Sequence, residues 1–177
     1  ESGEAGVPGE ASGSPGGAYK PASTEGPAEN VPVPERPLNA RGDSERAAVA
    51  TASYFWDTLY YLQRTGDPEP MNEVVLDQCQ ACDNWTEYFT WIYDQGGWET
   101  GERPKVSAAT VGRASDGSEG IMVYMVVQHS ASVGYDQYGI EVERDSSEPF
   151  TRAAWDVLTT WDSEQAQWLI SSVEMNG

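Results

Sequence analysis

The sequence predicts an α+β fold in which N-terminal helices pack on one face of a curved antiparallel sheet, behind a disordered leader. Three observations support this prediction. Residues 1–37 consist mostly of Gly, Pro, Ala, Ser and Glu, and Tyr19 is their only aromatic residue. Apolar residues recur with a helical period between residues 45 and 93. Beyond Trp98 the period changes to two, which is typical of strands.

The leader, residues 1–37, cannot bury enough apolar surface to offset its chain entropy, so we expect it to be disordered. Residues 38–177 hold all 7 Trp and both Cys, and we expect them to form one domain. A domain of this size buries roughly 68% of the surface of its unfolded chain, so its core is stable without a metal or a disulfide framework. A flexible leader before a single folded domain is typical of a tether.

The predicted helices cover residues 45–65, 71–76 and 80–93. Asp43 or Ser44 is suited to cap the start of the first helix, because a short polar side chain accepts from its free N–H groups. Gly66 is suited to end the same helix in a left-handed conformation.

The predicted strands cover residues 105–113, 120–130, 139–144, 150–161 and 166–175. Residues 120–130 are apolar on both faces, so we expect this strand to be central and covered on both sides. Helices followed by a series of antiparallel strands indicate a sheet with its helices on one face.

The charge of the chain excludes several classes of partner. The formal net charge is -19, and the 10 Lys and Arg residues are scattered along the sequence. Nucleic acids and anionic membrane surfaces bind clustered basic residues, so we expect neither as a partner. No stretch approaches the ~18 consecutive apolar residues that span a membrane. Membrane contact would therefore require a lipid anchor, which this sequence does not contain.

Three segments resemble an uncharacterised actinobacterial lipoprotein domain family: ERAAVATASYFWDTLYYLQRTGD, CQACDNWTEYFTWIYDQGGW and WDSEQAQWLISSV. The resemblance covers residues 37–173. It implies a lipid-anchored leader followed by a domain similar to the nuclear-transport-factor-two or ketosteroid-isomerase-like (SnoaL-like) cone fold. A cone of this kind has a curled sheet with a helical wall and a pocket at its mouth. The family implies no activity, and cone folds host enzymes as well as binding domains.

Cys79 and Cys82 form a C-x-x-C motif before the third predicted helix. In an oxidising envelope the motif predicts a structural disulfide across a short loop. A redox site is the alternative, although the βαβ pattern that usually accompanies one is missing. A metal site would need two further ligands. We therefore expect no metal and no cofactor.

His129, the single histidine, ends the strongest predicted strand. A strand residue that faces the interior of a cone lines its pocket, so His129 is a candidate general base or ligand contact. Asp136 and Glu141 follow shortly, but neither has a spacing that identifies it as a partner. The alternative is a hydrogen-bonded or solvated histidine without a functional role.

Aromatic residues crowd the first helix, and five of them within eight positions cannot all face one core. Exposed aromatic rings beside carboxylates are suited to a glycan, a small ligand or a partner protein. Packing between helices and sheet is the alternative for each of them. The candidate pocket residues are Tyr54, Trp56, Tyr61, Trp91, Trp98, Tyr124 and His129.

These features together predict an extracytoplasmic domain, anchored by a lipid or secreted, that binds a small ligand, a glycan or an envelope protein without catalysis. Two alternatives remain open. One is a cone-fold isomerase or hydrolase that uses His129 with a nearby carboxylate. The other is a structural spacer or adhesin, because Arg41-Gly42-Asp43 spells the tripeptide of integrin ligands.

Overall fold

The computed structural model describes residues 17–113 and 120–176. Its helical elements are η1 (Leu38–Ala40), α1 (Glu45–Thr65), α2 (Glu69–Asn72) and α3 (Gln80–Asp94). Its strands are β1 (Trp98–Glu99), β2 (Lys105–Gly112), β3 (Ile121–His129), β4 (Ser132–Tyr135), β5 (Glu141–Ser147), β6 (Phe150–Asp162) and β7 (Gln167–Asn176). The mixed α+β arrangement and the first and third predicted helices are confirmed. No described helix is long and apolar enough to cross a membrane.

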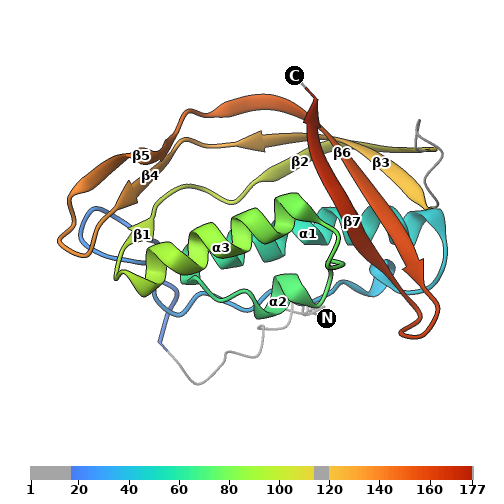
Figure 1. The fold of residues 1–177 in the computed structure, drawn as a ribbon, viewed down its shortest axis with the longest axis horizontal. Helices are drawn as coiled ribbons and strands as arrows, with labels where there is room; N and C mark the ends of the chain where they lie inside the picture. The colour runs from blue at the N-terminus through green and yellow to red at the C-terminus, as the bar shows by residue number, and fades with distance from the viewer. Residues whose placement is uncertain (1–16, 114–119, 177) are drawn as a thin grey trace, which may run out of the picture.

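The described strands form two antiparallel sheets rather than one. The larger sheet has the order β2-β3-β6-β7, and the smaller has the order β1-β4-β5. In Figure 1 the strands cover one side of α1 and α3, and α2 lies on the opposite side of these helices. The predicted single curved sheet, and with it the ketosteroid-isomerase-like cone, is therefore wrong.

The sheets divide where three connections pass from one to the other. These connections join β1 to β2, β3 to β4, and β5 to β6. The first contains Pro104 and the third contains Pro149. Proline has no backbone N–H to donate to a continuing ladder. In the first connection the backbone N–H of Glu102 donates instead to Ser130 Oγ at 2.7 Å. The hydrogen-bond ladder of the larger sheet therefore ends at these connections, and the strands of the smaller sheet pair separately.

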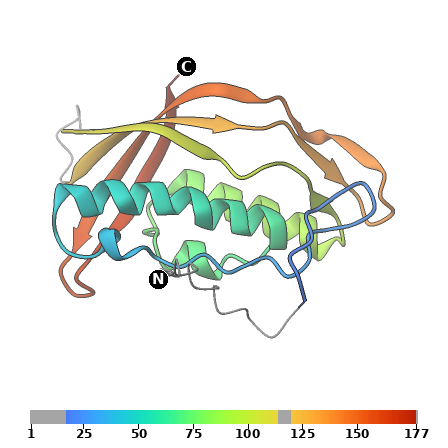
Figure 2. The same cartoon turned by 180° about the vertical axis from the view of Figure 1, so that it is seen from behind.

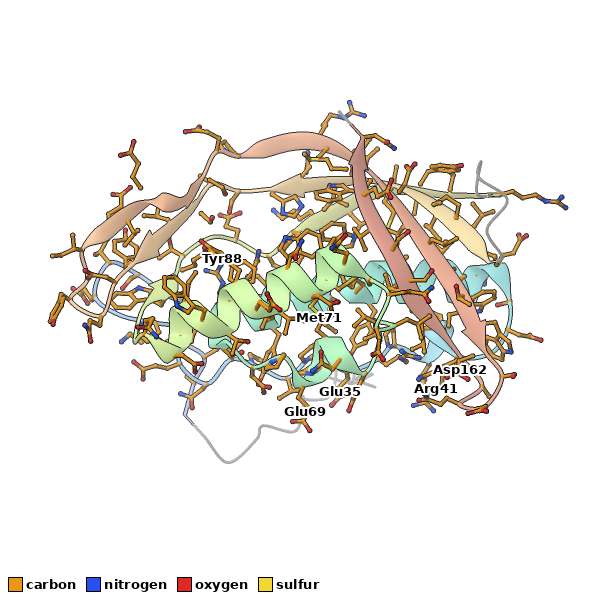
Figure 3. All side chains as sticks on the ribbon, in the orientation of Figure 1. Glu35, Arg41, Glu69, Met71, Tyr88 and Asp162 are labelled. Carbon is orange, nitrogen blue, oxygen red and sulfur yellow. A yellow bond between two sulfur atoms is a disulfide. The ribbon has the colours of Figure 1, made fainter. Side chains whose placement is uncertain are left out.

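The core lies between the larger sheet and the helices, and Trp56, Leu59 and Met71 are among its fully buried side chains. Figure 3 shows Met71 pointing into the interior and Glu69 pointing outward from the same short helix. β3 lies between β2 and β6, as expected of a central strand. Its second face is not covered, however, because Tyr124 remains 39% exposed there. The helices pack on one side of the sheet only.

Residues 17–37, which the sequence assigns to the leader, run along α1 on the side away from β2 and β3 (Figure 2). Several side chains of the domain bind this segment. Tyr54 donates from its hydroxyl to the carbonyl of Pro34 at 3.0 Å, and Trp98 donates from Nε1 to the carbonyl of Ser23 at 2.8 Å. Arg36 donates to Gln167 Oε1 at 2.6 Å. This part of the leader is therefore held against the domain.

Ser44 and Gly66 cap α1 at its two ends. The Ser44 hydroxyl accepts from the backbone N–H of Ala47 at 3.2 Å. Gly66 is left-handed, with φ 72, and its N–H donates to the carbonyl of Leu62. Both ends of this helix are therefore fixed by the residue types that the sequence predicts.

Cys79 and Cys82 form the predicted disulfide at the start of α3. Both residues are buried, with 0% and 1% of their surface exposed. A buried pair is closed to attack by a second thiol, which supports a structural role. The bond joins the connection after α2 to the first turn of α3.

Replacing both cysteines with alanine is expected to lower the free energy of unfolding by about 2 kcal/mol, because the bond closes a loop of about four residues in the unfolded chain. Urea denaturation of the variant and of oxidised wild-type protein measures the difference. The control is wild-type protein that is unfolded and refolded in the presence of a reductant, so that the disulfide stays open. Equal stability of the oxidised protein and the variant would contradict the structural role.

Candidate functional site

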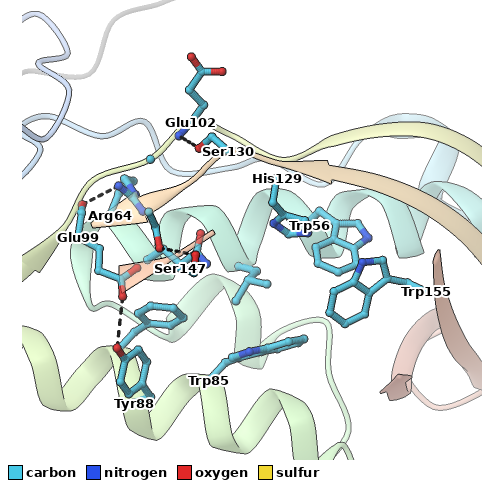
Figure 4. Close-up of a pocket in the computed structure, with 15 residues that line it drawn as sticks. Trp56, Arg64, Trp85, Tyr88, Glu99, Glu102, His129, Ser130, Ser147 and Trp155 are labelled. Carbon is cyan, nitrogen blue, oxygen red and sulfur yellow. Dashed lines mark hydrogen bonds between the residues drawn. The ribbon is translucent and has the colours of Figure 1, made fainter. Parts of the chain in front are cut away.

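A cavity of about 330 Å³ lies among α1, α3 and the junction between the two sheets. Its position follows from the divided sheet, since the strands separate where the cavity opens. Figure 4 shows the side chains that surround it. They are Trp56, Leu59, Gln63, Arg64, Trp85, Tyr88, Phe89, Glu99, Gly101, Glu102, His129, Ser130, Ser132, Ser147 and Trp155.

Three tryptophans from three elements form the apolar wall of the cavity. Trp56 comes from α1, Trp85 from α3 and Trp155 from β6. The rings of Trp56 and Trp155 meet edge to face, with their centroids 5.0 Å apart, and Trp85 lies 6.1 Å from Trp155. Edge-to-face contacts hold such rings in fixed orientations. The wall is therefore preformed.

Arg64 and Glu99 form a polar end of the cavity. Both side chains are buried, with 2% and 3% of their surface exposed. Arg64 Nη1 donates to the backbone carbonyl of Glu99 at 2.6 Å, and the Glu99 carboxylate accepts from the Tyr88 hydroxyl at 3.4 Å. The guanidinium also lies over the Tyr60 ring, 5.4 Å from its centroid. Burial, together with a hydrogen bond to Tyr19, raises the pKa of Tyr60 to about 12, so this ring is uncharged at neutral pH.

His129 ends β3 beside the tryptophan wall. Its ring lies 5.3 Å from Trp56 and 6.0 Å from Trp155, measured between centroids. Burial lowers the pKa of His129 from its ordinary value of 6.5, because the charged imidazolium loses solvation there. The imidazole is therefore neutral at neutral pH and can accept a proton or a hydrogen bond.

The lowered pKa of His129 predicts a pH dependence of stability. Below the unfolded value of 6.5 the unfolded state binds more protons than the folded state, so the free energy of unfolding falls as the pH falls through 6.5. The variant His129→Gln should lack this component. Denaturation of both proteins at pH values from about 7.5 to about 5 measures it. Parallel curves for the two proteins would contradict the assigned shift.

The structure brings together two of the seven candidate pocket residues, Trp56 and His129. Tyr61 instead donates to Asp67 Oδ2 at 3.4 Å. Tyr124 lies on the outer face of the larger sheet, and Trp91 is 45% exposed on α3. Tyr54 and Trp98 bind residues 17–37, as described above. Asp136, considered as a partner for His129, accepts instead from the backbone of its own β4–β5 turn.

The sequence also held signals for residues that the prediction missed. Arg64 follows Trp56 by eight positions, or about two helical turns, so the two share one face of α1. Trp85, Tyr88 and Phe89 have the i, i+3, i+4 spacing of one face of a helix. Glu99 and Trp155 have no spacing in the sequence that indicates a site. They come from different sheets, and only the placement of the sheets relative to each other brings them to the cavity.

Comparison with curated proteins finds no match. Among solved structures, the intermembrane space region of the chloroplast protein ARC6 is similar to this chain, with a TM-score of 0.49 and 14% sequence identity. The match covers 75% of this chain and 96% of that one. A family model described as a family of unknown function, DUF6318, matches residues 17–174. This match includes both the domain and the part of the leader that packs on α1. The chain therefore belongs to the DUF6318 family.

Proposed function

We propose that this protein is a binding domain of the cell envelope, which holds a small ligand in the tryptophan-walled cavity and does not transform it. The observation that carries the proposal is the cavity itself. Its volume of about 330 Å³ is at the lower end of the ~300–1,000 Å³ typical of small-molecule sites. Apolar walls with a few fixed polar groups are typical of such sites.

His129 lies against the tryptophan wall, with its ring 5.3 Å from Trp56 and 6.0 Å from Trp155 between centroids, which suits contact with a bound ligand. Figure 4 shows His129 facing Trp56, whereas Glu99 lies beside Arg64 and Tyr88. The imidazole is therefore better placed to contact an apolar ligand than to act with Glu99.

The composition of the leader supports a tethered, extracytoplasmic location. Residues 1–16 are rich in Gly, Glu, Ala and Ser, a composition suited to a flexible spacer. The disulfide between Cys79 and Cys82 also favours an oxidising compartment. The tether would connect to an anchored lipid upstream. Native protein should accordingly partition into the detergent phase of a cell extract, and recovery from the aqueous phase alone would contradict the anchor.

A cavity-blocking variant tests the binding proposal. Ser132 lies at the cavity on β4, so the variant Ser132→Trp should place a large ring in the opening. Ser107→Trp is the matched control, because Ser107 is exposed on a strand and lies away from the cavity. A library of small aromatic compounds is screened by NMR on wild-type protein, with the indole N–H resonances as reporters.

We expect some compounds to shift the indole resonances of the wild-type protein and of Ser107→Trp. The same compounds should bind Ser132→Trp much more weakly. Equal binding to all three proteins would place the compounds outside the cavity and contradict the proposal. A screen without any compound that shifts these resonances would also contradict it.

A further inference from the structure

Arg64 is the most unusual group in the cavity. Only 2% of its surface is exposed, yet no described carboxylate forms an ion pair with it. Only Nη1 has a hydrogen bond among the described residues, and Nε is buried without an acceptor there. A buried guanidinium without a counter-charge is costly. The guanidinium of Arg64 therefore favours a negatively charged group beside it.

The described acidic residues of the cavity do not form an ion pair with Arg64. The Glu99 carboxylate accepts instead from the Tyr88 hydroxyl at 3.4 Å. Glu102 is exposed, and its backbone N–H donates to Ser130. A cationic ligand would place its charge near the buried guanidinium of Arg64, and two like charges repel strongly where little water is present. An anion is therefore favoured over a cation at this end of the cavity.

We propose that the cavity binds a small carboxylic acid with an aromatic body, its carboxylate paired with Arg64 and its ring packed against Trp56, Trp85 and Trp155. This inference rests on the binding function proposed above and assigns the ligand class. At ~30 Å³ for each water-sized group, a cavity of about 330 Å³ holds on the order of ten heavy atoms. A single ring with a short acid chain has this size.

Three matched probes test the charge that the cavity selects. They are 3-phenylpropionate, 3-phenylpropanamide and 3-phenylpropylamine, which share one ring and one chain and differ in the charge of the head group. Calorimetric titration of wild-type protein gives the affinity of each, and NMR of the indole N–H groups reports whether it enters the cavity. We expect the acid to bind about 10- to 100-fold more tightly than the amide, as expected for a hydrogen bond to a charged group.

The variant Arg64→Gln tests the residue, with Arg46→Gln as the matched control on the exposed side of α1. We expect the preference for the acid to disappear in Arg64→Gln and to persist in Arg46→Gln. Circular dichroism checks that both variants fold. Should Arg64→Gln fail to fold, the ranking of the three probes on wild-type protein still decides the question.

The outcomes separate the two proposals. Binding of the amide or the amine in the cavity, as tightly as the acid or more so, overturns the ligand class and leaves the binding function standing. An unchanged preference for the acid in folded Arg64→Gln overturns the role of Arg64. Absence of all three probes from the cavity at millimolar concentration, together with a negative library screen, overturns the binding function itself.

Discussion

Replacing Trp56 with alanine is expected to lower the free energy of unfolding by about 3–5 kcal/mol, the range for truncation of a large buried aromatic side chain. Trp56 is 1% exposed. Its ring meets Phe55 at 5.4 Å and Trp155 at 5.0 Å between centroids, so its removal leaves both rings without a partner on one side. Equilibrium denaturation in urea measures the loss.

The control for this variant is Trp91→Ala on α3, where the ring is 45% exposed. We expect the control to cost far less, because much of that ring remains in water in the folded protein. A loss below about 1 kcal/mol for Trp56→Ala would contradict the packing of the core around this residue.

Replacing Gly66 with alanine is expected to cost about 2–5 kcal/mol, from two causes that act together. The left-handed backbone of Gly66, at φ 72, is strained for any residue with a Cβ atom. The added Cβ would also lie only 2.5 Å from the Cβ of Tyr93. Tyr93 donates to the carbonyl of Gln63 at 2.9 Å and so joins α3 to α1. The substitution would therefore separate the two helices that form one side of the cavity.

Gly42→Ala is the matched control, since Gly42 has a similar φ of 88 but no atom within 4 Å of the place that a Cβ would take. It should carry the backbone strain alone, about 1–2 kcal/mol. The difference between the two variants in thermal or urea denaturation isolates the steric clash with Tyr93. Equal losses would show that α3 does not pack against Gly66 as described.

The local elements of the fold could be predicted from the sequence, because local rules determine them. Helical periodicity and the caps at Ser44 and Gly66 predict α1 with its observed bounds. Alternating or continuous apolar runs predict the four strands of the larger sheet. The division into two sheets could not be predicted from alternation, because it depends on how three connections far apart in the sequence are placed relative to one another. β1 and β4 are too short to show a period and were missed.

The candidate site could be predicted only in part, for a related reason. Trp56 and His129 were found because each stands out in its own segment. Arg64 was missed because an arginine on a helix is usually solvated, and only the packing of α1 under the sheet junction shows that this one is buried. Trp98 was placed at the pocket because its partner, Ser23, lies 75 residues away in the leader.

The most direct test of the proposed ligand site is a crystal structure of the protein with 3-phenylpropionate at saturating concentration. We expect the phenyl ring packed against the wall of Trp56, Trp85 and Trp155, and the carboxylate within hydrogen-bond distance of Arg64. A cavity filled by the protein's own side chains, or a probe bound only at another surface, would contradict the assignment of this cavity as a ligand site.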